Sequence, residues 1–278
     1  MVRRPALAMI AVILCLLAAM SVEGSNPKRG LAFVPGNEKD LGKASGGQCS
    51  WLYNWAATPP ASVPSGLDFV PMQWGRDNVS SFADIVRNAS AKTILGFNEP
   101  DMPPPQSNIP AGEAAQLWRQ YIEPLKSDGV RLGSPAISSG PSGLPWLTEF
   151  MQACSNCTID FIVVHWYGNG TENFEGYLQS VHAKFSQPMW ITEFADTGNS
   201  SDTTTFMTAA LPYLDDPSQS WVERYSWFAF ARNLTGLQSN LLDGSGNLNA
   251  LGTSYIAGSR ARRGNGRRTR QSIDIDTY

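Results

Sequence analysis

The chain has 278 residues, of which 42% are apolar and 16% charged, and it contains 25 Gly, 19 Pro, 9 Trp and 4 Cys. This composition is typical of a globular protein and excludes the fibrous, disordered and disulfide-scaffold classes. Residues 25–258 carry 13 basic and 21 acidic residues, a net charge of −8, which disfavours nucleic acid and anionic membranes as partners. With only two histidines and no repeated CxxC pair, we expect no metal site.

The N-terminus has the pattern of a secretory signal peptide. Arg3 and Arg4 precede an apolar run at 6–20, and Gly24 ends a plausible cleavage site. The run is shorter than the roughly 20 residues of a spanning helix, so we expect cleavage after residue 24, no membrane span, and secretion to the extracellular space or cell wall. An uncleaved signal anchor is the alternative. Six asparagines begin N-glycosylation sequons: Asn78, Asn88, Asn156, Asn169, Asn199 and Asn233.

Three cysteines remain outside the leader, and two of them are close in sequence. Cys154 and Cys157 could close a tight disulfide loop in an oxidising compartment, with two buried thiols as the alternative, and Cys49 is left over. At the other end, residues 259–278 contain six arginines and almost no large apolar side chains. We expect a disordered tail there. The tail is either a solvated end without a function, or it binds the protein to an anionic wall or is processed at its basic pairs.

Short apolar or aromatic runs recur between Gly, Pro and Asn residues, as strands do. Eight such runs predict strands at 30–34, 50–55, 67–74, 93–97, 131–137, 161–167, 189–194 and 225–230. Amphipathic stretches at 111–128, 144–153, 172–185 and 203–214 predict helices between them. Alternating strands and helices indicate an α/β fold with a parallel sheet.

We expect residues 25–258 to form one domain, a (β/α)8 TIM barrel. Eight units over these 234 residues give about 29 residues each, close to the minimum for a strand and its crossover helix. The link between the second and third strands is too rich in proline for a good helix. A doubly wound open sheet is the competing architecture, but no GxGxxG or GxxxxGK[ST] motif follows any predicted strand.

Two predicted strands end on glutamate, where a barrel carries its reactive groups. The fourth reads TILGFNEPD and ends on Asn98 and Glu99, and the seventh reads PMWITEF and ends on Glu193. Two carboxylates across a cleft are what glycosidic cleavage requires, one to protonate the leaving oxygen and one to attack or to activate water. Alternatively, each merely caps a strand or pairs with an arginine such as Arg76 or Arg232.

The paired motifs GFNEPD and WITEFA resemble those of clan A glycoside hydrolases. The segments RGLAFVPG, CSWLYNW, GSPAIS and HWYG further resemble the fungal members of glycoside hydrolase family 128, over roughly residues 29–258. The resemblance implies a cofactor-free β-1,3-glucanase with a barrel fold that acts with retention of configuration and binds β-glucan, and we expect a monomer. It makes Glu99 the general acid/base, makes Glu193 the nucleophile and places Asn98 on the sugar 2-hydroxyl.

Other side chains are candidates for holding the carboxylates or the sugar. His165 and Tyr167 close the sixth strand, where either could hydrogen-bond Glu193. Sugars present flat C–H faces to aromatic platforms, and the resemblance makes Trp227 such a floor, with core packing as the alternative. Further candidates for the substrate subsites are Tyr53, Asn54, Trp55 and Trp74, each with core packing as the alternative, and Trp166 is another aromatic that could line the cleft.

Two other functions stay open at this point. A lectin-like wall protein would keep the barrel and bind β-glucan without turnover, although such a protein would be expected to lose a carboxylate, and both are present. Another clan A specificity, for β-1,4-glucan or mannan, is the second alternative, because the β-1,3 linkage depends on the resemblance. Endo or exo action depends on loops that the sequence does not describe.

Overall fold

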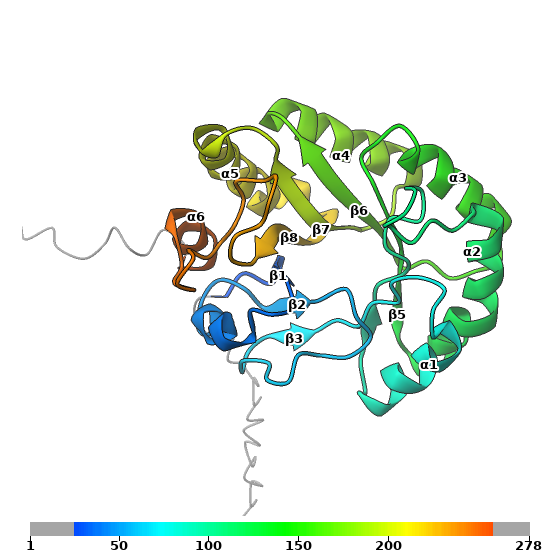
Figure 1. The fold of residues 1–278 in the computed structure, drawn as a ribbon. Helices are drawn as coiled ribbons and strands as arrows, with labels where there is room; N and C mark the ends of the chain where they lie inside the picture. The colour runs from blue at the N-terminus through cyan, green and yellow to red at the C-terminus, as the bar shows by residue number, and fades with distance from the viewer. Residues whose placement is uncertain (1–24, 258–278) are drawn as a thin grey trace, which may run out of the picture.

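The computed structural model describes residues 25–257, so the predicted signal peptide and the predicted tail lie outside the described residues. Eight parallel strands form one curled sheet in the order β3-β2-β1-β8-β7-β6-β5-β4 (Figure 1). The strands are β1 (Arg29–Phe33), β2 (Trp51–Tyr53), β3 (Asp68–Phe69), β4 (Thr93–Ile94), β5 (Arg131–Ile137), β6 (Phe161–Gly168), β7 (Met189–Asp196) and β8 (Val222–Phe230). The predicted α/β class and all eight strands are confirmed, although β3 and β4 are much shorter than predicted.

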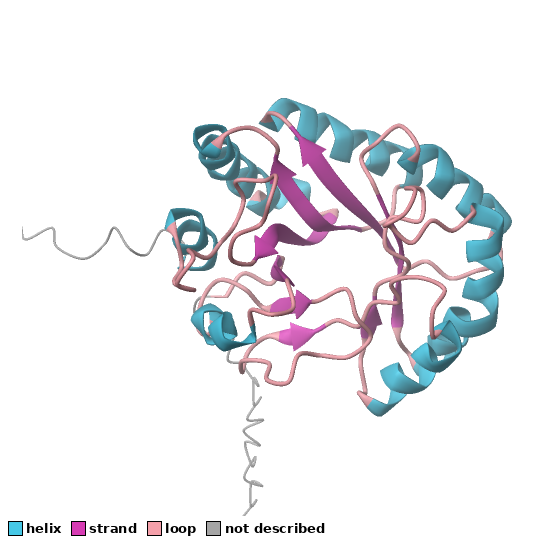
Figure 2. Cartoon of the chain, viewed as in Figure 1, coloured by secondary structure: helices cyan, strands magenta, loops and turns pink. Residues whose placement is uncertain are grey.

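Figure 2 shows the strands in the middle and the helices around them. The α-helices are α1 (Val79–Asn88), α2 (Ala111–Leu117), α3 (Gly143–Ala153), α4 (Thr171–Phe185), α5 (Ser200–Asp215) and α6 (Ala250–Gly252). Short 3-10 or π segments are η1 (Glu38–Ala44), η2 (Trp118–Ile122), η3 (Glu123–Asp128), η4 (Pro217–Gln219) and η5 (Thr253–Ala257). The four predicted helices are confirmed, the first as the succession α2, η2 and η3. No helix lies between β2 and β3, as the prolines predicted.

Side chains of the strands divide between two hydrophobic clusters. In β6, Ile162 and Val164 belong to a cluster that includes helical residues, whereas Phe161 and Val163 belong to a second, smaller cluster with Trp190 of β7. Neighbouring residues of a strand point to opposite faces, so the first cluster packs the sheet against its helices and the second fills the concave side. Both faces of the strands are therefore buried, which explains their near-continuous apolar sequences.

The ends of the sheet order, β3 and β4, approach each other just after their regular pairing stops. The backbone N–H of Gln73 donates to the carbonyl of Leu95 at 3.1 Å, and the N–H of Leu95 donates to the carbonyl of Pro71 at 2.9 Å. Met72 and Leu95 form an isolated parallel bridge. The segments that follow the two edge strands are thus joined by backbone hydrogen bonds at the carboxyl end of the sheet.

Cys154 and Cys157 form a disulfide at the end of α3, which confirms the first of the two alternatives for this pair. Cys49 is a free, buried thiol, and burial raises its pKa to about 12. Among residues 25–257, no helix is both long and apolar enough to cross a membrane.

Candidate active site

Glu193 is turned toward the concave side of the sheet by a bulge in β7. Along the β6–β7 pairing, Val164 lies opposite Ile191, but the next residue, His165, lies opposite Glu193, so Thr192 is an extra residue. A bulge re-aims the side chains that follow it. The Thr192 hydroxyl is hydrogen-bonded to His165 Nε2 at 3.0 Å, and Glu193, one residue later, reaches the same cluster.

Two groups donate to the Glu193 carboxylate, and a third, the Tyr53 hydroxyl, lies near it and donates its proton to the closer carbonyl of Thr192 at 3.0 Å. The Trp55 indole N–H donates to Oε1 at 2.7 Å, the Tyr53 hydroxyl is 3.4 Å from the same oxygen, and the Tyr167 hydroxyl donates to Oε2 at 2.5 Å. Burial, followed by the charge of Glu193, raises the pKa of Tyr53 and Tyr167 well above the usual value. Both phenols therefore keep their protons and are able to donate hydrogen bonds.

Glu99 lies on the loop that follows β4, one residue after the parallel bridge between Asn98 and Ala136 of β5. Its backbone N–H donates to the carbonyl of Ala136 at 2.8 Å, and its carbonyl accepts from the N–H of Met102 at 3.1 Å. The φ angle of Glu99 is 40°, in the left-handed region that few residues other than glycine adopt. These hydrogen bonds hold the buried side chain against His165.

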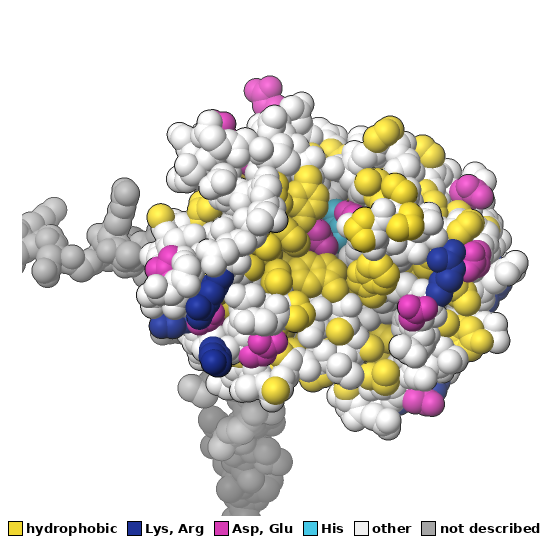
Figure 3. Space-filling model, viewed as in Figure 1, with side chains coloured by type: hydrophobic (Ala, Val, Ile, Leu, Met, Phe, Trp, Pro, Cys, Tyr) yellow, Lys and Arg dark blue, Asp and Glu magenta, His cyan; other side chains and the backbone are white. Residues whose placement is uncertain are grey.

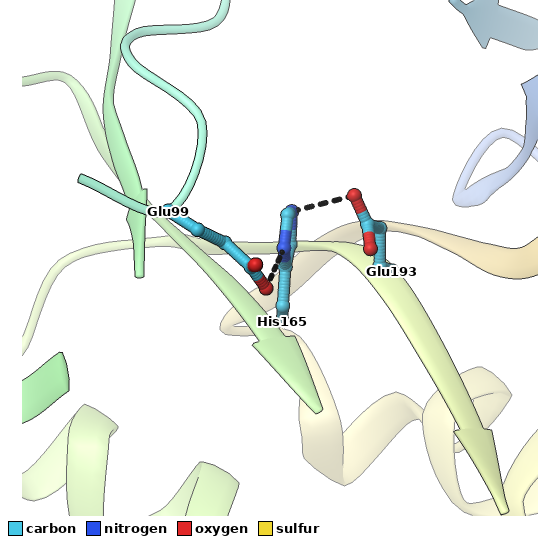
Figure 4. Close-up of side chains that lie close together, drawn as sticks. All are labelled: Glu99, His165 and Glu193. Atoms are coloured by element: carbon cyan, nitrogen blue, oxygen red, sulfur yellow. Dashed lines mark hydrogen bonds and ion pairs between the residues drawn. The ribbon is translucent and has the colours of Figure 1, made fainter. Parts of the chain in front are cut away.

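His165 is fully buried and lies between the two carboxylates (Figure 4). Its Nδ1 is 2.9 Å from Glu99 Oε1, and its Nε2 is 3.3 Å from Glu193 Oε1. A carboxylate oxygen of each glutamate and a ring nitrogen of His165 all lie within 4.8 Å of one another. Burial alone lowers the pKa of His165, but the charges of Glu193 and Glu99 and the hydrogen bond to Glu99 outweigh it, so this pKa is raised.

The two glutamates line a cavity of about 580 Å³ at the carboxyl end of the strands. Figure 3 shows this hollow, with acidic and histidine atoms at its base and hydrophobic side chains around it. The other lining residues are Trp55, Trp74, Asn98, Met102, Gln106, Ser138, Ser139, Gly140, Tyr167, Phe228 and Leu237. Trp74 is the exposed large hydrophobic side chain of the described residues, at 37%. The cavity thus combines an acid pair with aromatic walls.

Besides the two glutamates, five candidate residues lie at this cavity: four line it, and one lies directly behind the glutamates. Trp55, Trp74, Asn98 and Tyr167 line it. His165 is fully buried behind the glutamates and contacts the two carboxylates rather than the cavity. The predicted hydrogen bond from Tyr167 to Glu193 is confirmed, whereas His165 joins both carboxylates rather than Glu193 alone.

The prediction of Trp227 as an aromatic floor is wrong. Its side chain is 0% exposed, donates to the carbonyl of Ser239 at 2.8 Å and packs edge-to-face on Phe194, 5.2 Å between ring centroids. Because adjacent strand residues face opposite ways, Trp227 points to the helices and the next residue, Phe228, lines the cavity. The β8 aromatic at the site is therefore one position further along.

Asn54 and Trp166 are also wrong as subsite predictions. The Asn54 side chain serves its own turn, since its amide donates to the carbonyl of Thr58 at 3.1 Å and accepts from the N–H of Ala56 at 3.2 Å. Trp166 packs on Phe174 and Phe206 outside the sheet. Neither lines the cavity.

Sequence reasoning missed Gln106, Phe228 and the Ser138–Gly140 turn among the cavity residues. Gln106 belongs to the loop that begins at the NEP motif, and the serines follow directly on β5. Both are segments that leave the carboxyl end of a strand, which is the signal that could have found them.

The side chains of Glu99, His165 and Glu193 could also serve as ligands of a divalent cation. However, both ring nitrogens of His165 already face hydrogen-bond partners in these side chains and in Thr192. Each ring nitrogen of His165 therefore already has a polar neighbour inside the cluster.

Comparisons with known proteins agree with this geometry. The profile of the family described as "Glycosyl hydrolase catalytic core" matches residues 30–255. The alkali-sensitive linkage protein 1 of Schizosaccharomyces pombe is 39% identical over 245 residues, which are 83% of this chain and 44% of that protein. The chain thus spans less than half the length of this curated relative.

Solved structures extend the comparison. A curdlan-specific exo-β-1,3-glucanase of family 128 from Blastomyces gilchristii, in complex with glucose, is 35% identical, with a TM-score of 0.71 over 83% of this chain and 99% of that one. An endo-β-1,3-glucanase of the same family from Amycolatopsis mediterranei, in complex with laminarihexaose, is 32% identical, with a TM-score of 0.70 over 83% and 98% of the two chains. The chain belongs to the glycosyl hydrolase catalytic core family and, within it, to glycoside hydrolase family 128.

Proposed function

We propose that this protein hydrolyses β-1,3-glucan with retention of configuration, Glu99 acting as the acid/base and Glu193 as the nucleophile. The observation that carries the proposal is the approach of two carboxylates to within 4.8 Å at the base of one cavity. An approach of one oxygen of each carboxylate to within this distance fits the ~5–5.5 Å that separates the two carboxyl groups of retaining glycosidases.

In the first step, Glu99 donates its proton to the glycosidic oxygen while a Glu193 oxygen bonds to the anomeric carbon, and the bond from that carbon to the leaving oxygen breaks. In the second, Glu99 takes a proton from water, the water oxygen attacks the anomeric carbon, and Glu193 leaves as a carboxylate. Glu99 ends protonated, as it began. No cofactor is needed to balance either step.

The surroundings of the two carboxyl groups support this division of labour. Glu193 accepts hydrogen bonds from the N–H of Trp55 and the hydroxyl of Tyr167, whereas the polar contact of Glu99 is with the buried His165. Different environments for two carboxyl groups are how one site provides both an acid and a nucleophile.

The substrate assignment combines the cavity with the relatives. A neutral sugar suits a chain with a net acidic body, and Trp55, Trp74 and Phe228 provide aromatic surface around the acid pair. The solved relatives named above act on β-1,3-glucan. We extend that linkage to this chain.

Product analysis with laminarin, a cellulosic glucan and a mannan tests the assignment. We expect glucose or laminari-oligosaccharides from laminarin and little product from the other two polymers. Release mainly from the cellulosic glucan or from the mannan would replace the β-1,3 linkage by another clan A specificity. Binding to laminarin without any product would favour a lectin-like wall protein on the same fold.

A leaving-group series tests the roles of the two glutamates. Glu99→Gln should lose about 10²–10⁴-fold in kcat on laminarin, because the glycosidic oxygen then leaves without a proton. The same variant should lose less on an aryl β-laminarioside with a good leaving group, whereas Glu193→Gln should be inactive on both. Equal losses of the two variants on every leaving group would contradict the assigned roles.

We also propose that the sheet closes as a (β/α)8 barrel. Support comes from the strand order, which places β3 and β4 at its two ends, and from the hydrogen bonds of Leu95 with Pro71 and Gln73. A closed barrel directs all eight loops that follow the strands to one rim. The position of both glutamates on such segments agrees with this.

Secretion, with removal of residues 1–24, completes the proposal. The disulfide between Cys154 and Cys157 suits an oxidising compartment. All six sequon asparagines are exposed. N-terminal sequencing and glycosidase treatment of the protein from its culture medium test both points, and protein that stays with the cells in full length would contradict them.

A further inference from the structure

Backbone pairing along β5 ends at the acid/base glutamate. The N–H of Ala136 donates to the carbonyl of Phe97, and the N–H of Glu99 donates to the carbonyl of Ala136, each at 2.8 Å. In a regular parallel ladder the next bond runs from the N–H of Ser138 to the carbonyl of Glu99. That carbonyl accepts from Met102 instead, at 3.1 Å, since Glu99, with its φ of 40°, turns the chain away from β5.

The side chain of Asp101 takes the place of the carbonyl that has turned away. The N–H of Ser138 donates to Asp101 Oδ1 at 3.0 Å, and the hydroxyls of Ser138 and Ser142 donate to Oδ2 at 2.6 and 2.9 Å. Hydrogen bonds to a carboxylate are stronger than those to a neutral carbonyl. Asp101 therefore holds the turn after Glu99 onto the segment after β5, one step past the bond between Glu99 and Ala136.

Both segments that Asp101 joins belong to the cavity. The Ser138–Gly140 turn lines it on one side, and the Ser138 hydroxyl that donates to Asp101 also accepts the N–H of Gly140 at 3.2 Å. On the other side, the Glu99 carboxyl group extends to His165, 2.9 Å away (Figure 4). A shift of the turn between these segments would move the Glu99 carboxyl group relative to the bond that it protonates.

We propose that Asp101 is a positioning residue for the acid/base. Its carboxylate fixes the turn that carries Glu99, and with it the place from which Glu99 gives its proton to the leaving oxygen. Asp101 itself is not among the residues that line the cavity. This inference rests on the proposed function, because it gives Asp101 a part in the same proton transfer. The alternative is a purely structural role at the start of α3, whose N-cap is Ser142.

Two substitutions separate the hydrogen bonds of Asp101 from its charge. Asp101→Ala removes the charge and both acceptor oxygens. Asp101→Asn removes the charge too, but it keeps one oxygen for the N–H of Ser138, and its amide donates to the serine hydroxyls, which accept as well as donate. Asp160→Ala is the matched control, because Asp160 also accepts a backbone N–H of β5, that of Leu132 at 2.8 Å, but at the amino end of the strand.

The experiment compares two leaving groups. The glycosidic oxygen of laminaritriose needs the proton of Glu99 in order to leave, whereas the phenolate of a dinitrophenyl β-laminaribioside leaves without it. The measured quantity is kcat/KM on laminaritriose divided by kcat/KM on the aryl substrate. We expect Asp101→Ala to lower this ratio about tenfold or more, since a ~1 Å misplacement of a catalytic group costs up to about 10²-fold. Asp101→Asn and Asp160→Ala should stay within about twofold of wild type.

The fraction of folded enzyme cancels in this ratio, so a purely structural role does not change it. An unchanged ratio in Asp101→Ala, with only a lower melting temperature, would overturn the proposal. A ratio lowered as far by Asp101→Asn would also overturn it, because the charge would then act rather than the hydrogen bonds. If Asp101→Ala does not fold, Ser142→Ala, which removes one of the three donors, should lower the ratio about threefold or more, and an unchanged ratio there would contradict the proposal.

Failure of the proposed function is recognised separately, by wild-type protein that hydrolyses neither substrate. Amide hydrogen exchange, measured by NMR, then decides the role of Asp101 independently of turnover. Exchange at the amides of Ser138 and Met102 should be faster in Asp101→Ala than in wild type and in Asp101→Asn, because the turn that carries Glu99 opens more often. Unchanged exchange at Met102 would contradict the role of Asp101 in fixing that turn.

Discussion

Two buried ionic clusters lie at opposite ends of the sheet, and they are built differently. At the amino end, Arg29 of β1 is paired with Asp215 at 2.8 Å, and donates to the hydroxyl of Tyr225 at 3.0 Å and to the carbonyl of Tyr255 at 2.7 Å. Asp215 also accepts from Tyr225 and from Asn26, each at 2.6 Å. One positive and one negative charge are balanced there, with partners for both.

At the carboxyl end, Glu99 and Glu193 share the single imidazole of His165. Two carboxylates and one histidine leave a negative excess when both glutamates are ionised, and the neighbouring Asn98 Oδ1 has no hydrogen-bond partner within residues 25–257. The balanced cluster contributes to stability, whereas the unbalanced one keeps protons and acceptors for a substrate. The difference agrees with a structural role for the first cluster and with the catalytic role proposed for the second.

The largest contrast is expected when a charge is removed from the unbalanced cluster. Glu193→Gln should lower kcat on laminarin by about 10³-fold or more, because the amide cannot form the covalent intermediate. Its melting temperature should equal or exceed that of wild type, since residues selected for activity are commonly kept at a cost in stability. Kinetics and thermal unfolding measure both effects.

Glu223→Gln is the matched control for this prediction. Glu223 also lies on a strand, but it pairs with Arg131 at 2.8 Å near the amino end of the sheet. Its loss should leave kcat within about twofold of wild type, as surface ion pairs contribute little. A similar loss of turnover in both variants would show that the effect is not specific to the site.

The opposite pattern is expected at the balanced cluster. Arg29→Met removes the cation from between Asp215 and two tyrosines. The free energy of unfolding should fall by about 3 kcal/mol. This is the lower end of the range for a broken buried ion pair, because the Asp215 side chain is 30% exposed. Denaturant unfolding measures this loss. Turnover per folded molecule should be unchanged, and a selective loss of kcat without a loss of stability would contradict the comparison.

Aromatic residues sharpen the same contrast. Trp74→Ala should weaken laminari-oligosaccharide binding by ~1–3 kcal/mol, by analogy with the stacking of bases on aromatic side chains, and leave the melting temperature nearly unchanged. Trp227→Phe should lower the melting temperature through a core cavity and leave KM unchanged. Calorimetric titration and thermal unfolding decide between them, and a reversed pattern would place the platform at Trp227 after all.

The smallest effect expected is a pH dependence of stability from His165. Its pKa is raised in the folded protein, with Glu193, Glu99 and Asp101 as the acidic groups around it. The stability it contributes is therefore full below the unfolded pKa of about 6.5 and is lost as the pH rises through the higher folded value. The difference in unfolding free energy between wild type and His165→Gln should be largest below about pH 6.5.

Denaturant unfolding between about pH 5 and 9 measures this difference. His182→Gln is the control, because its ring stacks on Trp221 and forms no ion pair among the described residues. A stabilisation by His165 that grows with pH would contradict the assignment of its charged partners.

The strands were predictable because each is an apolar run between turn residues, and β5 has the predicted bounds. Strands β3 and β4 are shorter because regular pairing gives way to isolated bridges at Met72 and Asn98. Helix α1 was missed, although Val79, Phe82 and Val86 form a buried stripe at helical spacing in an otherwise polar sequence. Periodicity could have found it.

Side-chain direction was the part that the sequence did not contain. In β8, aromatic residues occupy consecutive positions, so no alternation distinguishes Trp227 from Phe228, and a one-residue difference exchanges core and cavity. The bulge at Thr192 and the contact of His165 with both glutamates likewise arise from strand register. Glu99 and Glu193 could be named because each lies within a recognisable motif. The distance between the two side chains could not be derived from the sequence.

The anomeric configuration of the first product tests the central claim most directly. Proton NMR during hydrolysis of laminarin by the wild-type enzyme follows the new reducing end before mutarotation mixes the anomers. Double displacement at Glu193 predicts that the β-anomer appears first and the α-anomer only later. Initial release of the α-anomer would mean inversion, and would contradict the covalent role of Glu193 that the close approach of the two carboxylates supports.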